Sequence, residues 1–74
     1  MRELARAFFA QGKTVRAAAL MLNLIKTEPT SENLELLADI YMRQGLFDDA
    51  KELYLQVVKS EMKPNARGAV SERN

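Results

Sequence analysis

Residues 37–58 read LADIYMRQGLFDDAKELYLQVV and determine the architecture of this chain. Apolar side chains recur every three or four residues on both sides of Gly45, which is the spacing of one face of an α-helix. Gly45 interrupts this pattern, and glycine readily takes the left-handed conformation that follows a helix. Asp48 and Asp49 come next, and acidic side chains favour the first turn of a helix. The segment therefore predicts two helices joined by a tight turn.

The same pattern occurs earlier in the chain, in residues 4–25, LARAFFAQGKTVRAAALMLNLI. A single shift, which we call the repeat offset, places Leu4 on Leu37 and Gly12 on Gly45. Further matched pairs are Ala5 with Ala38, Phe8 with Tyr41, Ala17 with Ala50, Met21 with Tyr54, and Leu24 with Val57. A helix pair repeated at about this period is typical of a helical solenoid, in which each pair buries a face against the next.

These residues resemble the tetratricopeptide repeat, whose motif combines a leucine and a small residue, an aromatic, a turn glycine, a small residue in the second helix and a closing proline. The matching positions are Leu4, Ala5, Phe8, Gly12, Ala17, Met21, Leu24 and Pro29 in one unit and Leu37, Ala38, Tyr41, Gly45, Ala50, Tyr54 and Val57 in the other. The resemblance covers roughly residues 1–62. It implies an all-α helical-hairpin array of four antiparallel helices, with helix pairs over 1–29 and 30–62 and with Ala5 and Ala38 at close helix crossings.

Breaks in the apolar pattern predict where each helix ends. Gly12 ends the first helix, and Thr14 is expected to cap a second one that runs from Val15 to about Thr27. A third helix begins at Thr30 or Ser31 and reaches about residue 44, and the fourth, with acids in its first turn, reaches about residue 62. Residues 63–74 have no apolar period and are expected to form a polar, disordered tail.

The composition argues against an enzyme. The 74 residues contain no Cys, His or Trp, so the commonest general base, the best nucleophile and the usual metal ligands are missing. Asp48 and Asp49 are interpreted as acids that complement the dipole of a helix N-terminus rather than as metal ligands, and no glycine-rich phosphate loop is present. We therefore expect no catalytic residue, no cofactor and no metal. Without a secretory segment or about 18 consecutive apolar residues, we also expect no membrane contact and, by default, a cytoplasmic protein.

The small size predicts that the chain needs a partner. A chain this short buries only about 60% of its surface on folding, and the disulfides and zinc sites that stabilise small domains are missing. Solenoids generally need about three repeats, and this chain carries fewer than two full units. We expect the missing contacts to come from a homo-oligomer, most simply a dimer, from another protein, or from the rest of a longer chain.

Charge is unevenly distributed along the sequence. Residues 1–27 carry five basic residues and one acid, whereas residues 28–62 carry eight acids and three basic residues. The two parts should attract each other. The repeat offset places Arg2 on Glu35 and Arg6 on Asp39, so ion pairs between the first and third helices are predicted.

The resemblance also implies a concave groove, lined by the first helix of each pair, that binds a peptide or protein partner. The lining residues would be Arg2, Arg6, Phe9, Glu35, Asp39, Met42 and Arg43, together with Ala10. Phe9 and Met42 would form an apolar floor. A clamp for a terminal carboxylate is not expected, because Glu35 and Asp39 occupy two of the places that would need basic side chains.

The second helix is apolar around most of its circumference, which predicts burial on several sides. Val15, Ala19 and Leu22 share its outer face at i, i+4 and i+7, and Leu55 is the matching residue of the second unit. These residues form either an exposed face of high helix propensity or an interface for a partner or a second copy.

Together these observations predict a non-enzymatic protein-interaction module: an adaptor, a chaperone or an assembly subunit. The alternative is binding of single-stranded RNA. The stretch from Gly45 to Pro64 is longer than the stretch from Gly12 to Pro29, and this longer ending resembles a pentatricopeptide repeat. Acidic residues on the first helices would repel phosphates, so nucleic acid is the less favoured partner.

Overall fold

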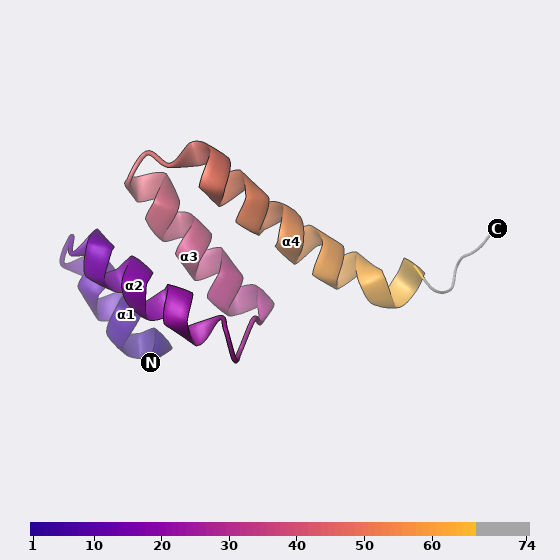
Figure 1. Cartoon of the computed structure of the whole chain (residues 1–74), viewed down its shortest axis with the longest axis horizontal. Helices are drawn as coiled ribbons and strands as arrows, with labels where there is room; N and C mark the ends of the chain where they lie inside the picture. The colour runs from indigo at the N-terminus through magenta and orange to yellow at the C-terminus, as the bar shows by residue number, and fades with distance from the viewer. Residues whose placement is uncertain (67–74) are drawn as a thin grey trace.

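The fold is two helical hairpins placed side by side. The computed structural model describes residues 1–66, with side chains described for residues 1–60. Within these residues the chain forms α1 (Arg2–Ala10), α2 (Thr14–Leu24), α3 (Ser31–Arg43) and α4 (Phe47–Ala66), with no strand. α1 packs against α2, and α3 lies between α2 and α4 (Figure 1). The all-α hairpin array expected from the sequence is confirmed.

The two hairpin turns are built identically. Gly12 and Gly45 both have φ of 81°, the left-handed conformation that glycine tolerates. After α1, the Gly12 N–H donates to the Phe9 carbonyl at 3.0 Å and the Lys13 N–H donates to the Phe8 carbonyl at 2.8 Å. After α3, the two equivalent bonds measure 3.1 and 2.9 Å. Each turn is a Schellman motif, which satisfies the last carbonyls of one helix and sends the chain back antiparallel.

This turn corrects the expected start of the second helix. Lys13 is the N-cap of α2 and Thr14 is already helical, so the prediction that Thr14 caps the helix is wrong. The Schellman turn uses the residue after glycine both to close α1 and to open α2, whose first bond runs from the Ala17 N–H to the Lys13 carbonyl at 3.1 Å. No position is left for a separate capping residue.

α2 also ends earlier than expected, at Leu24 instead of Thr27. Its final turn tightens, because the Thr27 N–H donates to the Leu24 carbonyl at 3.1 Å and the Thr27 hydroxyl donates to the same oxygen at 3.3 Å. Such i to i−3 bonds satisfy carbonyls at a helix end without extending the α-helix. The start of α3 agrees with the sequence, since Thr30 is the N-cap and its hydroxyl accepts from the Asn33 N–H at 3.2 Å.

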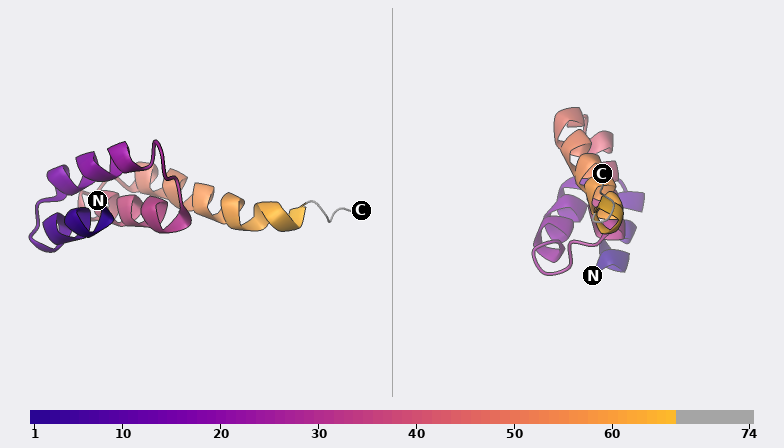
Figure 2. Two further views of the ribbon diagram at one scale, coloured as in Figure 1. Left: turned by 90° about the horizontal axis from the view of Figure 1, so that it is seen from below. Right: turned by 90° about the vertical axis from the view of Figure 1, so that its right-hand side faces the viewer.

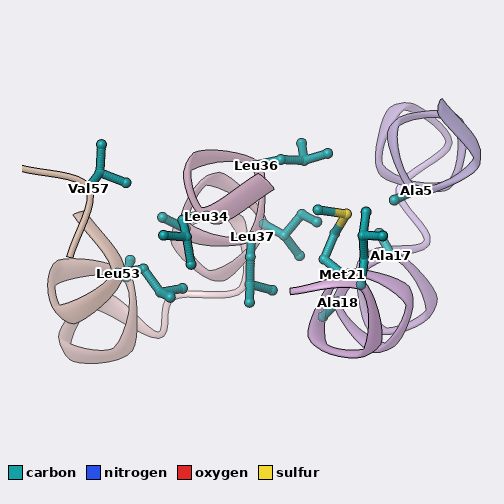
Figure 3. Packing of buried hydrophobic residues seen from close by; sticks show 13 residues of the cluster. Ala5, Ala17, Ala18, Met21, Leu34, Leu36, Leu37, Leu53 and Val57 are labelled. Carbon is teal, nitrogen blue, oxygen red and sulfur yellow. The ribbon is translucent and has the colours of Figure 1, made fainter. Parts of the chain in front are cut away.

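The core runs as one cluster through both hairpins (Figure 3). Ala5 and Ala38, which are expected at close helix crossings, and the matched motif alanines Ala17 and Ala50 are all fully buried at 0% exposure. Met21 points from α2 toward Leu37 of α3, while Leu34 and Leu53 fill the space between α3 and α4 (Figure 3). The helices can approach closely where alanine replaces a larger side chain.

α4 extends past its expected end at Met62 to Ala66 and includes Pro64. A proline removes one backbone hydrogen bond from a helix but does not have to end it. The C-terminal part of α4 projects beyond the other three helices (Figure 2). The remainder of the expected tail, residues 67–74, lies outside the described residues.

Candidate functional site

The face made by α1 and α3 carries a small polar cleft of about 90 Å³, which we call the α1–α3 cleft. Its lining residues are Arg6, Glu32, Glu35, Leu36 and Asp39. The structure thus brings together three of the predicted groove residues, one basic and two acidic. All three are exposed and can reach a ligand.

The ion pairs expected across this face do not form. Among residues 1–60, the only ion pair within 4.0 Å joins the N-terminal amine to Glu3. Arg2 donates instead from Nη1 to the Asn33 Oδ1 at 3.3 Å. Arg6 lines the cleft with Glu35 but is not paired with it or with Asp39. The repeat offset aligns these residues in the sequence but does not bring their charged atoms together. Contact also depends on how α1 and α3 are rotated about their axes.

Asn33 is the one buried polar residue of the described core, with 2% exposure, and sequence reasoning missed it. Its Nδ2 donates to the Glu28 carbonyl at 2.8 Å, its backbone N–H bonds to Thr30, and its Oδ1 accepts from Arg2. Asn33 therefore ties α1 to the loop between the two hairpins. Arg2, half-buried in this network, has a structural role that the groove prediction did not include.

Asp39 accepts a hydrogen bond from the Tyr54 hydroxyl at 2.5 Å. This bond raises the pKa of Tyr54 to about 12, with burial and the negative charges of Asp39 and Glu35 adding to it. Burial, followed by the charge of Asp49, also raises the pKa of Tyr41. Asp39 is thus engaged with α4, not with α1.

Phe9 and Arg43, two of the predicted groove residues, lie close together. The Arg43 guanidinium lies 4.7 Å from the centroid of the Phe9 ring, a favourable cation–π distance. Phe9 is only half-buried, although it packs against the core. At the same end of α1, the Lys13 ammonium lies 5.9 Å from the centroid of the Phe8 ring.

Met42 does not share a floor with Phe9. It lines a separate apolar groove of about 340 Å³ between the end of α3 and α4, which we call the end groove. The lining residues are Met42, Phe47, Lys51, Tyr54, Leu55 and Val58. Phe47 is 61% exposed and Val58 49% exposed, so this apolar surface is open.

The end groove is the surface that sequence reasoning missed. Tyr54 belongs to the repeat motif and Val58 to the apolar face of its helix, so both look like core residues. Their exposure could have been inferred from the first unit, where the corresponding residues Met21 and Ile25 are the ones placed to contact the second unit. Those contacts have no counterpart beyond α4 within the described residues.

The outer face of α2 is exposed to solvent. Val15 is 73% exposed, Leu22 is 45% exposed, and Ala19 between them is exposed. We call these three residues the α2 stripe. Leu55, the matching residue of the second unit, is 47% exposed and lines the end groove.

Neither a metal site nor a membrane span is found in the described part of the chain. No three Cys, His, Asp or Glu side chains there come close enough to hold an ion. No helix in that part combines the length and the hydropathy needed to cross a bilayer.

The repeat units, their identical turns and their alanine packing are all features of one sequence family. A family model described as a tetratricopeptide repeat matches residues 4–72. The chain belongs to the tetratricopeptide repeat family. Such repeats generally mediate protein–protein interactions and are typically non-catalytic. No curated protein and no solved structure gives a significant match to this tetratricopeptide repeat chain.

Proposed function

We propose that this tetratricopeptide repeat chain is a non-enzymatic interaction module that binds a peptide or protein segment on the face formed by α1 and α3. One observation carries the proposal: the α1–α3 cleft holds Arg6 beside Glu35 without an ion pair between them. Both charges remain available, and charge-assisted hydrogen bonds to a ligand are the stronger kind. An adaptor, a chaperone or an assembly subunit would use such a surface.

The chemistry of this face indicates what the ligand carries. Arg6 suits a carboxylate, Glu35 suits a basic side chain, and the exposed part of Phe9 suits an apolar or aromatic anchor. A segment of mixed charge with one such anchor therefore fits best. RNA is less well supported, since three carboxylates and one guanidinium line the cleft and phosphates would be repelled.

Peptide display against the immobilised chain tests this proposal. We expect selected peptides to bind the parent at least about tenfold more tightly than a Glu35→Lys variant, because reversing this exposed charge sets it against the ligand's basic side chain. Glu52→Lys is the matched control, since Glu52 is an exposed acid of α4 outside the cleft. If every selected peptide binds the parent and Glu35→Lys equally, the α1–α3 face is not the binding surface.

Self-association through the α2 stripe is a second candidate function. It is supported by the exposure of Val15, at 73%, and of Leu22, at 45%, on one helix face. A closed symmetric dimer that places α2 against its own copy would cover both residues.

Light scattering across a range of concentrations separates this candidate from the first. If the stripe forms a dimer, the parent reaches twice the mass of a single chain. Leu22→Glu then returns it to the monomer mass, and Arg6→Ala in the cleft leaves the dimer intact. A parent chain that stays monomeric at high concentration removes the dimer and leaves the peptide-binding proposal untouched.

A further inference from the structure

The end groove is a larger apolar surface than the α1–α3 cleft, and it is open. Met42, Tyr54, Leu55 and Val58 are between 36% and 49% exposed. Among the residues that the structure describes, Lys51 is the one charged residue that lines the groove. Exposed apolar surfaces that are rimmed by polar groups mark sites of interaction with other proteins.

The first repeat unit shows what covers such a groove. With the repeat offset, Met42, Tyr54 and Val58 correspond to Phe9, Met21 and Ile25. In the first unit Met21 is fully buried, and Phe9 and Ile25 are partly buried against the core. α3 lies against α2 and covers Met21 (Figure 3). The part of the end groove formed by Met42, Tyr54 and Val58 is thus the same kind of surface, and no helix among the described residues covers it.

A second copy of this chain, stacked head to tail on the end groove, would present its α1 to the groove, and α1 does not have the side chains of such a covering helix. α3 covers the first unit with Leu36, which is directed toward α1 (Figure 3). Ile40 follows one helical turn later, and both residues are buried. The corresponding residues at the start of the array, on α1, are Glu3 and Ala7. A charged and a small side chain cannot fill an apolar groove, so α1 of a second copy is a poor occupant.

We propose that the end groove binds an amphipathic helix of a partner protein, with large apolar side chains spaced as Leu36 and Ile40 are spaced in α3. The partner helix carries an acidic side chain that pairs with Lys51, a residue lining the groove. Lys51 corresponds to Ala18 in the first unit. α3 itself is such a helix, since it combines Leu36 and Ile40 with the acids Glu32, Glu35 and Asp39. This site lies apart from the α1–α3 cleft and does not depend on peptide binding there.

A synthetic peptide with the sequence of residues 30–44, TSENLELLADIYMRQ, is the probe. We expect the fluorescently labelled peptide to bind the full chain saturably, with a Kd below about 1 mM. Val58→Glu in the protein should weaken this binding at least about tenfold, because it places a charge on the groove wall. Lys51→Glu should weaken it as well, since it reverses the charge that meets the acidic side chains.

The matched control is Leu4→Glu, which introduces the same charge at a residue of α1 that, like Val58, is 49% exposed and that lies outside the groove. It should change the Kd by less than about twofold, and a peptide with glutamate at the Leu36 and Ile40 positions should bind at least about tenfold more weakly. Circular dichroism confirms that each protein variant is folded. A selected cleft ligand must bind Val58→Glu normally, so failure of this site and failure of the cleft are distinguishable.

Three results would overturn the proposal. One is the absence of saturable binding up to about 1 mM, and another is binding that Val58→Glu leaves unchanged. The third is a parent chain with twice the mass of a single chain that Val58→Glu returns to a monomer, because a second copy would then be the occupant of the groove.

Discussion

The Tyr54 hydroxyl on α4 donates to the Asp39 carboxylate on α3 at 2.5 Å, and this bond lies between the two candidate binding surfaces. Asp39 lines the α1–α3 cleft and Tyr54 lines the end groove. A ligand in the α1–α3 cleft would meet Asp39, and a ligand in the end groove would meet Tyr54. The hydrogen bond fixes the orientation of these two side chains relative to each other. Asp39 forms no ion pair with Arg6 within residues 1–60, although the repeat offset predicts one.

The alkaline titration of Tyr54 should report this bond. Its pKa in the folded chain is raised to about 12 from the ordinary 10.0. The stabilisation from this group is therefore fully present below pH 10 and is lost as the pH rises from about 10 to about 12. In a Tyr41→Phe background, where Tyr54 is the one remaining tyrosine, tyrosinate absorbance should show a midpoint near 12.

Adding Asp39→Asn should move that midpoint back toward 10.0, because both the carboxylate acceptor and its charge are removed. Asp48→Asn, an acid of α4 that does not contribute to the shift, should leave it in place. A midpoint near 10 with Asp39 present would show that the bond does not persist in solution.

Gly12→Ala and Gly45→Ala should each lower the free energy of unfolding, and by similar amounts. Gly12 and Gly45 both have φ of 81°, and an added Cβ would meet nothing within 4 Å at either position. The cost is therefore backbone strain alone, about 1–2 kcal/mol for each substitution. Chemical denaturation measures it. A gain in stability, as an ordinary Gly→Ala substitution gives, would mean that the Schellman turns are wrong.

Asn33→Ala should lower the free energy of unfolding by about 1–3 kcal/mol, since it leaves the Glu28 carbonyl and the Arg2 guanidinium without their partner. Asn23→Ala on the exposed face of α2 is the control and should fall within about 0.5 kcal/mol of the parent. Urea denaturation of the two variants provides the comparison. Equal stabilities would remove Asn33 as the link between the hairpins.

Ala38→Leu should also destabilise the chain, by about 1–3 kcal/mol, because Ala38 has 0% exposure between packed helices. For a domain of this size each kcal/mol lowers the Tm by about 4–8 °C. Ala7→Leu places the same side chain on the exposed face of α1 and should leave the Tm close to that of the parent. If both variants melt like the parent, the helix packing described above is incorrect.

The sequence predicts the helices and their repeat because both depend on local patterns. The glycine turns and the four buried alanines recur at one offset, and the structure confirms them. The helix ends are harder to predict. Thr14 has the chemistry of a capping residue, but the shared Schellman turn gives that place to Lys13.

The side-chain partners could not be predicted from spacing. The repeat offset aligns Arg2 with Glu35, yet Arg2 reaches Asn33, because contact depends on how α1 and α3 are rotated about their axes. The same limit applies to Tyr54, which the motif identifies as a packing residue. Its exposure follows from its place at the end of the described array, where no further helix covers it.

Amide shift mapping by NMR tests the central claim most directly. A peptide selected on the full chain is titrated into the ¹⁵N-labelled protein, and shift changes are assigned along the sequence. Binding on the face of α1 and α3 predicts that the largest changes fall on Arg6, Phe9, Glu35 and Asp39. Changes that spare these four residues and fall on α2 or on the outer face of α4 would contradict it.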